Sequence, residues 1–440
     1  MLHSCGHAWW PHLEPSSRQA LRLVCKLSCR VMDDSVTKLS DCSETRKCPR
    51  EQLPPPARWP GVTQLLLSDT DDWNRWHDRG TRLGTSTSQL PPRLERVELT
   101  ACLTDEAVAA QGLLPLASLA PTLRHLVLAR NEFCFAYACD ALTSVLSTLT
   151  SLEHLCMYDN SQDYGSKVAQ ALSPALPCLT NLKQLCIMEV DAEDSFDAIV
   201  RDIAGLTLLE HLRLDLRPSG VKGLAPALQG MTRIQSLDIS TYCAFCPEIA
   251  SDVAEALAAV PSLQSLRLDS VMCSPSFSLI APSLTALHTL ILVRSGCADH
   301  GRTLAEMLQA LPSLTSLALR GNAFAAPDWQ HLGPGFGALT GLQQLDLSSV
   351  SDGGGATAAP GAAALALALP QLKGLRVLKL GDSQDLVVKG AAHLLPAIGK
   401  LHASLEELDL ATEWDGDAKA NKRAAPWLAE VRGAVQVQCG

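Results

Sequence analysis

The segment LRHLVLARN, residues 123–131, recurs in altered form along most of the chain and constrains the fold more than any other feature. Apolar residues occupy its first, fourth and sixth positions, and asparagine occupies its ninth. The same spacing returns in LEHLCMYDN at 152–160 and in LTSLALRGN at 314–322. Self-similarity at a fixed period is typical of proteins that are built from stacked structural repeats.

Twelve copies of the pattern apolar-x-x-apolar-x-apolar follow one another at a mean spacing of about 28 residues, and a weaker copy starts at Val62. The twelve copies start at Leu94, Leu123, Leu152, Leu182, Leu209, Ile234, Leu263, Leu287, Leu314, Leu342, Leu375 and Leu405. Because apolar and polar residues alternate within each copy, the pattern predicts a short strand. The residues that follow, such as PEIASDVAEALAAVPSL, have apolar side chains at helical spacing and end at a proline, which predicts a helix.

This strand-plus-helix unit resembles the leucine-rich repeat, and its length resembles the ribonuclease-inhibitor-like class of that family. The resemblance implies an α/β solenoid of about 12 repeats, a horseshoe with a parallel sheet on its concave face and helices on its convex face. Geometry agrees, since neighbouring strands are about 4.8 Å apart whereas helices need about 10 Å. We expect leucine-rich repeats over 62–412 and a C-terminal cap over 413–440, with a last helix and then a short strand.

The copies are not uniform, and their differences predict local structure. Asparagine occupies the ninth position at Asn131, Asn160 and Asn322, whereas other copies place Val190, Val271 or Val350 there, which cannot form the same amide hydrogen bonds. The steps of 25 residues after Leu209 and 24 after Leu263 predict shortened or 3₁₀-like convex segments. The longer step after Leu342 contains SDGGGATAAPG, which predicts a surface insertion.

The first 50 residues allow two interpretations. A helix that starts near Ser16 would carry an apolar stripe through Leu21, Val24 and Cys25 and could simply cover the first repeat. Alternatively, LRLVCK at 21–26 resembles the last helix of an F-box, the module that docks substrate receptors onto cullin-type ubiquitin ligases through a Skp-family adaptor. That resemblance implies adaptor contacts by Leu21, Leu23 and Val24. PREQLPPPARWP then predicts a proline-rich linker over 51–61.

Charge and composition restrict the class of partner and the compartment. The formal net charge is −10 and the isoelectric point is about 5.6, which argues against general binding of nucleic acid or anionic membranes. The sequence shows no secretory signal and no run of 18 apolar residues. The 16 cysteines are scattered, so we expect reduced thiols and a cytoplasmic or nuclear protein.

Candidate chemistry is sparse. CAFC at 243–246 is a single CxxC, and a zinc site would need a second pair of ligands. His125, His154 and His211 occupy the same strand position in three copies, so a metal site is conceivable, but an exposed strand position samples polar residues freely. The sequence contains no convincing catalytic constellation. We therefore expect neither enzymatic activity nor a metal or other cofactor.

Side chains at the third, fifth and seventh positions of each copy should face the concave side, because successive strand residues alternate. This rule predicts a mixed-charge surface that binds a protein partner. Its members are Arg213, Asp215, Asp238, Arg267 and Asp269, with His125, His154 and Tyr158 as a second candidate area. Three functions remain open: a ubiquitin-ligase substrate adaptor, a scaffold such as those of the ciliary axoneme, and a GTPase activator, which some proteins of this repeat class are.

Overall fold

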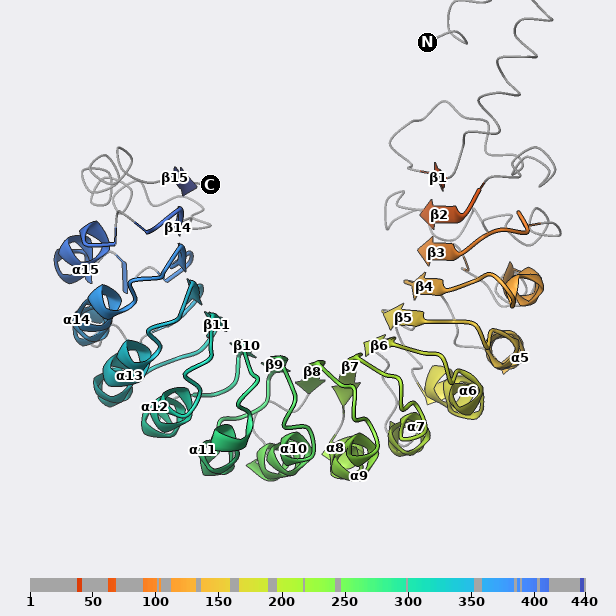
Figure 1. The fold of residues 1–440 in the computed structure, drawn as a ribbon, viewed down its shortest axis with the longest axis horizontal. Coiled ribbons are helices and arrows are strands. Elements are labelled where there is room, and N and C mark those ends of the chain that lie inside the picture. The colour runs from red at the N-terminus through yellow and green to blue at the C-terminus, as the bar shows by residue number, and fades with distance from the viewer. Residues whose placement is uncertain are drawn as a thin grey trace, which may run out of the picture. The chain divides into compact units, whose positions relative to one another are not determined.

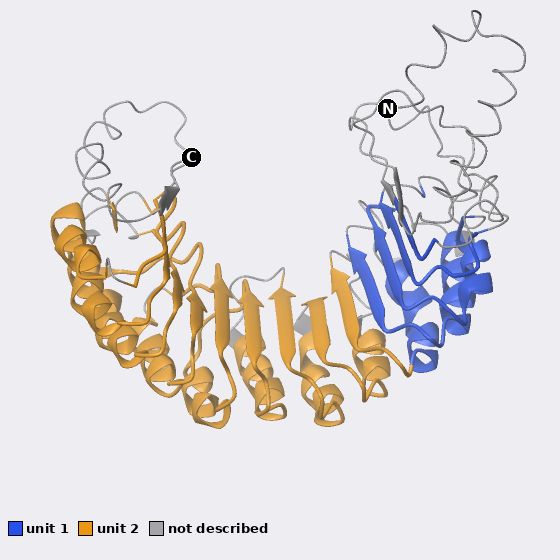
Figure 2. Ribbon diagram, turned by 45° about the horizontal axis from the view of Figure 1, so that its top comes forward, with its two compact units in different colours: residues 1–179 blue, residues 180–440 orange. Residues whose placement is uncertain are grey.

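The computed structural model describes the repeat region and three short outlying segments of the 440-residue chain. The described residues are 38–41, 62–68, 90–100, 103, 112–131, 136–158, 166–188, 196–216, 218–241, 247–297, 300–351, 358–383, 386–387, 390–401, 404–410 and 436–438. They divide into two compact units, residues 1–179 and residues 180–440 (Figure 2).

Unit 1 is a parallel sheet that helices cover on one face (Figure 1). Its strands are β1 (Lys38–Asp41), β2 (Gln64–Ser68), β3 (Arg96–Thr100), β4 (His125–Ala129) and β5 (His154–Tyr158). Its helical segments are η4 (Leu114–Leu119), α5 (Ala136–Thr148), α6 (Ser166–Ala175) and η5 (Leu176–Cys178). Strands β1 and β2 extend the sheet beyond the first strong copy of the sequence pattern.

Unit 2 continues the same alternation, with each strand parallel to the next in chain order. Its strands are β6 (Gln184–Met188), β7 (His211–Leu216), β8 (Ser236–Thr241), β9 (Ser265–Asp269), β10 (Thr289–Val293), β11 (Ser316–Ala318), β12 (Gln344–Asp346), β13 (Val377–Lys379), β14 (Glu407–Asp409) and β15 (Gln436–Gln438). Within this unit the strands line the concave side and the helices the convex side (Figure 2).

The helices of unit 2 vary in length with the repeat. They are α7 (Phe196–Ile203), α8 (Pro218–Lys222), α9 (Leu224–Gln229), α10 (Pro247–Ala258), α11 (Pro275–Ile280), η6 (Ala281–Ser283), α12 (Gly301–Gln309), α13 (Ala326–Ala338), α14 (Ala358–Ala368), η7 (Leu369–Gln371) and α15 (Gly390–Gly399). The two short sequence steps contain the short α8 and α9 and the α11–η6 pair, so the prediction of shortened convex segments is confirmed.

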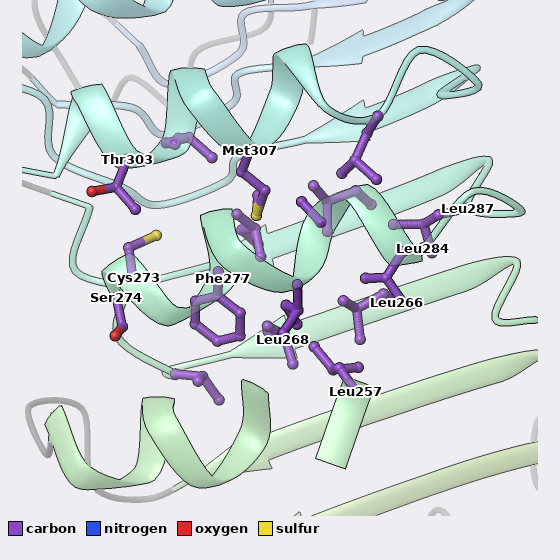
Figure 3. Close-up of a pocket in the computed structure, with 17 residues that line it drawn as sticks. Leu257, Leu266, Leu268, Cys273, Ser274, Phe277, Leu284, Leu287, Thr303 and Met307 are labelled. Carbon is purple, nitrogen blue, oxygen red and sulfur yellow. The ribbon is translucent and has the colours of Figure 1, made fainter. Parts of the chain in front are cut away.

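The prediction of a leucine-rich-repeat solenoid is confirmed. Within the described residues, the twelve strands β3–β14 coincide with the twelve copies found in the sequence. Leucines at the first, fourth and sixth positions are buried, as Leu263, Leu266 and Leu268 show. Figure 3 shows the last two beside Phe277, around an apolar cavity of about 20 Å³ that offers water no polar partner.

The two ends are described only in part. Strand β1 lies inside the segment 1–50, for which the sequence predicts a helix, and it pairs with β2. The predicted helix itself, the linker 51–61 and the predicted last helix near Trp427 lie outside the described residues. Strand β15 occupies the predicted C-terminal cap and pairs with β14. The division of the chain into caps, linker and repeats stays a prediction.

Asparagine side chains join consecutive repeats at the ninth position. Asn131 accepts a hydrogen bond from the Leu103 backbone N–H at 3.0 Å and donates one to the Leu99 carbonyl at 2.9 Å. Asn322 bonds the repeat before its own in the same way. It accepts a hydrogen bond from the Ser295 N–H at 2.8 Å and donates one to the Leu292 carbonyl at 3.0 Å. Each amide thus satisfies one donor and one acceptor that the preceding loop buries.

Serine performs the same task in a repeat that lacks asparagine. The hydroxyl of Ser383 accepts from the Val350 N–H at 2.9 Å and donates to the Leu347 carbonyl at 2.6 Å. A hydroxyl can do both because it carries one donor and two lone pairs. In these three repeats the ninth position supplies one buried group that both donates and accepts, and either asparagine or serine can provide it.

Among the described residues, the one just before the ninth position takes a left-handed backbone in six repeats. These residues are Arg130 (φ 53°), Ser270 (59°), Arg294 (48°), Gly321 (65°), Ser349 (56°) and Asp382 (57°). This conformation is uncommon for residues other than glycine. Its reason is a cross-repeat hydrogen bond: the N–H of Ser270 donates to the Val293 carbonyl at 2.8 Å, and Arg130, Arg294, Gly321 and Ser349 repeat this bond to the next repeat. The turn thus extends the hydrogen bonding between repeats by one residue beyond β4, β9 and β10, and by three residues beyond β11 and β12.

We expect Asn322→Ala to lower the free energy of unfolding by about 2–4 kcal/mol, because it leaves a buried N–H and a buried carbonyl without their partner. Gln344→Ala is the matched control, since that exposed amide accepts only a long bond of 3.3 Å from the Ser316 hydroxyl. Urea unfolding of both variants measures the difference. Equal small losses for the two would contradict a structural role for the ninth position.

Candidate functional site

Alternating charges cross the strand face of unit 2, as the fifth-position rule predicts. The register pairs Arg213 of β7 with Asp238 of β8, and Asp238 with Arg267 of β9. Asp238 lies 3.0 Å from the Arg213 Nε and 3.6 Å from the Arg267 Nε. Arg267 also reaches Asp269 at 3.2 Å, and Asp269 bonds Arg294 at 2.9 Å. We name these five residues the arginine–aspartate row.

The two charge types lie at different depths in the row. The side chains of Arg213 and Arg294 are 44% and 67% exposed, whereas those of Asp238 and Asp269 are only 17% and 10% exposed. The carboxylates are therefore less accessible than the side chains of Arg213 and Arg294, although the Nε of Arg213 is itself buried. A ligand that approaches the row meets N–H donors first.

Asp215 is buried, although its sequence position predicts an exposed side chain on the concave face. It occupies the seventh position of its repeat, yet the whole residue is only 3% exposed. Buried to this extent, its carboxylate can influence the row by charge but offers almost no surface to a partner. Asp269 is likewise only 7% exposed, so a partner would contact its arginines, Arg267 and Arg294, rather than its carboxylate.

A second ion pair and a hollow lie farther along the same face. Arg320, two residues after the end of β11, bonds Asp346 of β12, with its Nε 2.6 Å from the carboxylate. Between this pair and the arginine–aspartate row, the fifth positions hold Ile291 and Ala318, which leave a hollow of about 190 Å³. The lining residues are Arg267, Ile291, Ser316, Leu317, Ala318, Arg320, Gln344, Leu345, Asp346, Val377 and Lys379.

The sequence also carries a signal for this part of the surface, beyond the residues predicted above. Asp346 and Lys379 occupy fifth positions and Arg320 a seventh position, so the same rule would have included them. Arg294 carries no such signal, because it stands at the eighth position. Its left-handed backbone, absent from any sequence pattern, accompanies its bond to Asp269.

His125 and His154 come together in unit 1. Their rings stack with centroids 4.1 Å apart and planes 15° from parallel. Burial lowers the pKa of His125 below its ordinary value, and the nearby His154 and Arg96 lower it further. Tyr158, at 36% exposed, lies at the end of the same strand as His154. The stacked histidines and, at the other end of β5, Tyr158 are the residues of the second predicted area.

Other predicted groups are resolved only in part. Among the described residues, no group of three or more His, Cys, Asp or Glu side chains is placed to hold a metal ion. The CAFC segment and the three adaptor-contact residues Leu21, Leu23 and Val24 lie outside the described residues. None of the described helices is long and apolar enough to span a membrane.

Burial raises the pKa of the Asp238 carboxyl above its ordinary value, although Arg213 and Arg267 lower it. A carboxyl whose pKa is higher in the folded state binds protons more tightly there. Its contribution to stability therefore falls as pH rises from the unfolded-state pKa through the folded-state pKa. Desolvation thus outweighs the two ion pairs, and ionised Asp238 costs stability at neutral pH.

We therefore expect Asp238→Asn to leave the free energy of unfolding at pH 7 unchanged or up to about 1 kcal/mol higher, and to reduce the gain in stability on acidification. Thermal melts at pH 7 and pH 4 test this. Asp346→Asn serves as the control and should destabilise at pH 7, because Asp346 accepts bonds from both Arg320 and the Ser348 N–H. A clear loss of stability in Asp238→Asn at pH 7 would show that its ion pairs dominate.

Comparison with known proteins gives limited similarity. No family model matches the chain. Protein NLRC5 of Ictalurus punctatus is 28% identical over 158 residues, which cover 34% of this chain and 9% of that protein. The chain therefore corresponds to a small part of this relative.

The chain is also similar to solved structures, including an internalin and the protein LegL7. An internalin (inlF) from Listeria monocytogenes is 21% identical, covers 67% of this chain and 68% of its own, and has a TM-score of 0.39. The leucine-rich repeat-containing protein LegL7 from Legionella pneumophila is 17% identical, covers 64% of this chain and 89% of its own, and has a TM-score of 0.38. The register, the buried leucines and the ninth-position hydrogen bonds of the chain itself show that its fold is a leucine-rich-repeat solenoid.

Proposed function

We propose that the chain is a protein-interaction module that binds a protein partner across the strand face of unit 2, from β7 to β13. The observation that carries this proposal is the depth of the charges in the arginine–aspartate row. Exposed ion pairs contribute only about 0–1 kcal/mol to stability, so folding alone gives little reason for this surface. A protein that presents carboxylates would find guanidinium groups already held in place.

Arginine suits this task because its planar guanidinium carries five N–H donors and can bond a carboxylate through two of them. In Arg294, the Nε and Nη2 atoms contact Asp269 at 3.2 Å and 2.9 Å, yet the side chain remains two-thirds exposed. The aspartates therefore orient the arginines without covering them. Pre-orientation lowers the entropy that binding must overcome.

The hollow beside the row favours a protein over a small molecule. Its volume of about 190 Å³ is below the roughly 300–1,000 Å³ of typical small-molecule pockets. It could instead receive one side chain of a partner, with Ile291 and Ala318 as an apolar floor and Arg320 at the rim. A buried anchor side chain surrounded by polar contacts is typical of protein interfaces.

We expect Arg213→Ala combined with Arg267→Ala to weaken partner binding at least tenfold and to reduce its dependence on salt, because each lost charge-assisted bond is worth about 1.5–3 kcal/mol. Ala318→Phe, which fills the hollow, should weaken binding while leaving the salt dependence intact. Arg302→Ala is the matched control, since Arg302 is 78% exposed on α12 and pairs only with Glu306.

The experiment uses the full chain as bait in cells, with mass spectrometry to identify proteins that bind the wild type and the control but neither surface variant. The purified partner is then titrated at several salt concentrations. If every partner binds all variants equally, the strand face of unit 2 is not the interface. The surface around His125, His154 and Tyr158 in unit 1 would then be the next candidate.

Within this function, a role as an F-box-type substrate adaptor remains one proposal among three, beside an axonemal scaffold and a GTPase activator. If LRLVCK docks a Skp-family adaptor, Leu21→Asp with Val24→Asp should abolish adaptor capture and leave binding by unit 2 intact. These substitutions are preferable to deleting residues 1–50, since the deletion would also remove strand β1. Failure of the wild type to capture the adaptor would leave the helix as a cap of the first repeat.

A further inference from the structure

Two buried thiols lie side by side in consecutive repeats of unit 2. Cys273 follows β9 by four residues and Cys297 follows β10 by four residues, so both occupy the eleventh position of their repeats. Their Sγ atoms are 2.7 Å apart, and the residues are 6% and 0% exposed. Both are free thiols in this structure. A disulfide would need the sulfurs at about 2.05 Å, a small further approach.

The surrounding bonds hold the two loops at this spacing. The Cys273 N–H donates to the Ser295 carbonyl at 3.0 Å, and the Ser270 N–H donates to the Val293 carbonyl at 2.8 Å. Asp269 and Arg294 join the same two repeats on the concave face. The thiols are thus held together by the register of the repeats, which a cross-link would preserve.

We propose that Cys273 and Cys297 are a modification site, which thiol–disulfide exchange with a low-molecular-weight disulfide such as oxidised glutathione converts into a cross-link between the two repeats. This inference does not depend on the proposed partner surface. It also differs from the expectation of permanently reduced cysteines, since it makes this pair responsive to the thiol–disulfide balance around the protein.

The chemistry proceeds in two exchanges. The Cys273 thiolate attacks one sulfur of glutathione disulfide, forms a mixed disulfide and releases one glutathione thiolate. The Cys297 thiolate then attacks the Cys273 sulfur, forms the protein disulfide and releases the second glutathione. Two protein thiols are oxidised, one glutathione disulfide is reduced, and the two thiol protons pass to the two glutathione molecules.

Accessibility sets the order and the rate of these steps. Cys273 is the more exposed of the two thiols, so it is the one that an oxidant reaches first. The hydrogen bond with Cys273, together with burial, raises the pKa of Cys297 well above its ordinary value, so little thiolate forms there at neutral pH. Reaction therefore requires a transient opening of the loop after β9 and should be slow in the folded protein.

The test exposes the purified full chain to oxidised glutathione, both folded and during refolding from urea, and then blocks the remaining thiols by alkylation. Trypsin cleavage after Arg267, Arg294 and Arg302 places the two cysteines on separate peptides, 268–294 and 295–302. We expect these peptides to be joined by a reducible bond, and the oxidised protein to melt about 3–5 °C higher than the reduced one.

Cys297→Ser should abolish the linked peptides and remove the difference in melting between the oxidised and reduced forms. Cys178→Ser, the control in unit 1, should leave both unchanged. A linkage that forms in the folded protein, even slowly, supports the proposal, whereas a linkage that forms only during refolding would contradict a site that responds in the folded state. Recovery of both cysteines as alkylated thiols under both conditions, or their linkage to other cysteines, would overturn it.

Discussion

The structure depends on a leucine stripe that no single repeat can bury. A strand and a helix of one repeat leave the side chains at the first, fourth and sixth positions only half covered, and the next repeat completes their burial. The burial of Leu266 and Leu268 illustrates this, because residues from the neighbouring repeats surround them in the core of unit 2. Stability is therefore distributed along the stack as a sum of contributions from the repeats and from the interfaces between them.

Stacking also buries backbone N–H and carbonyl groups between repeats, and side chains at the ninth position form hydrogen bonds with some of them. The loop that leaves each strand buries backbone groups that no strand or helix satisfies. Asn131 and Asn322 reach back to the preceding loop, and Ser383 does so with a hydroxyl. The left-handed residue before this position directs its N–H to the next repeat. Together these bonds fix the spacing of consecutive loops, which is also what brings Cys273 and Cys297 together.

The positions that the core leaves free carry the chemistry. Along the concave face of unit 2, the core requires only that every second strand residue be apolar, so the residues between can vary. They hold the arginine–aspartate row, a hollow floored by Ile291 and Ala318, and the Arg320–Asp346 pair. A partner surface and a thiol pair can therefore coexist in neighbouring repeats without disturbing the leucine core.

The sequence by itself determined the repeat length, the strand positions, the shortened convex segments and the residues that face the core, because burial of a periodic stripe leaves a periodic trace. It also indicated that Arg213, Asp238 and Arg267 would be neighbours, since parallel register follows from the repeat. Only the tertiary structure decided the depth of each charge, such as the burial of Asp215, and the contacts of Arg294. It alone showed that Ser383 replaces asparagine and that two thiols meet. These outcomes depend on side-chain conformations and on the paths of loops in neighbouring repeats. The periodic sequence pattern specifies neither of them.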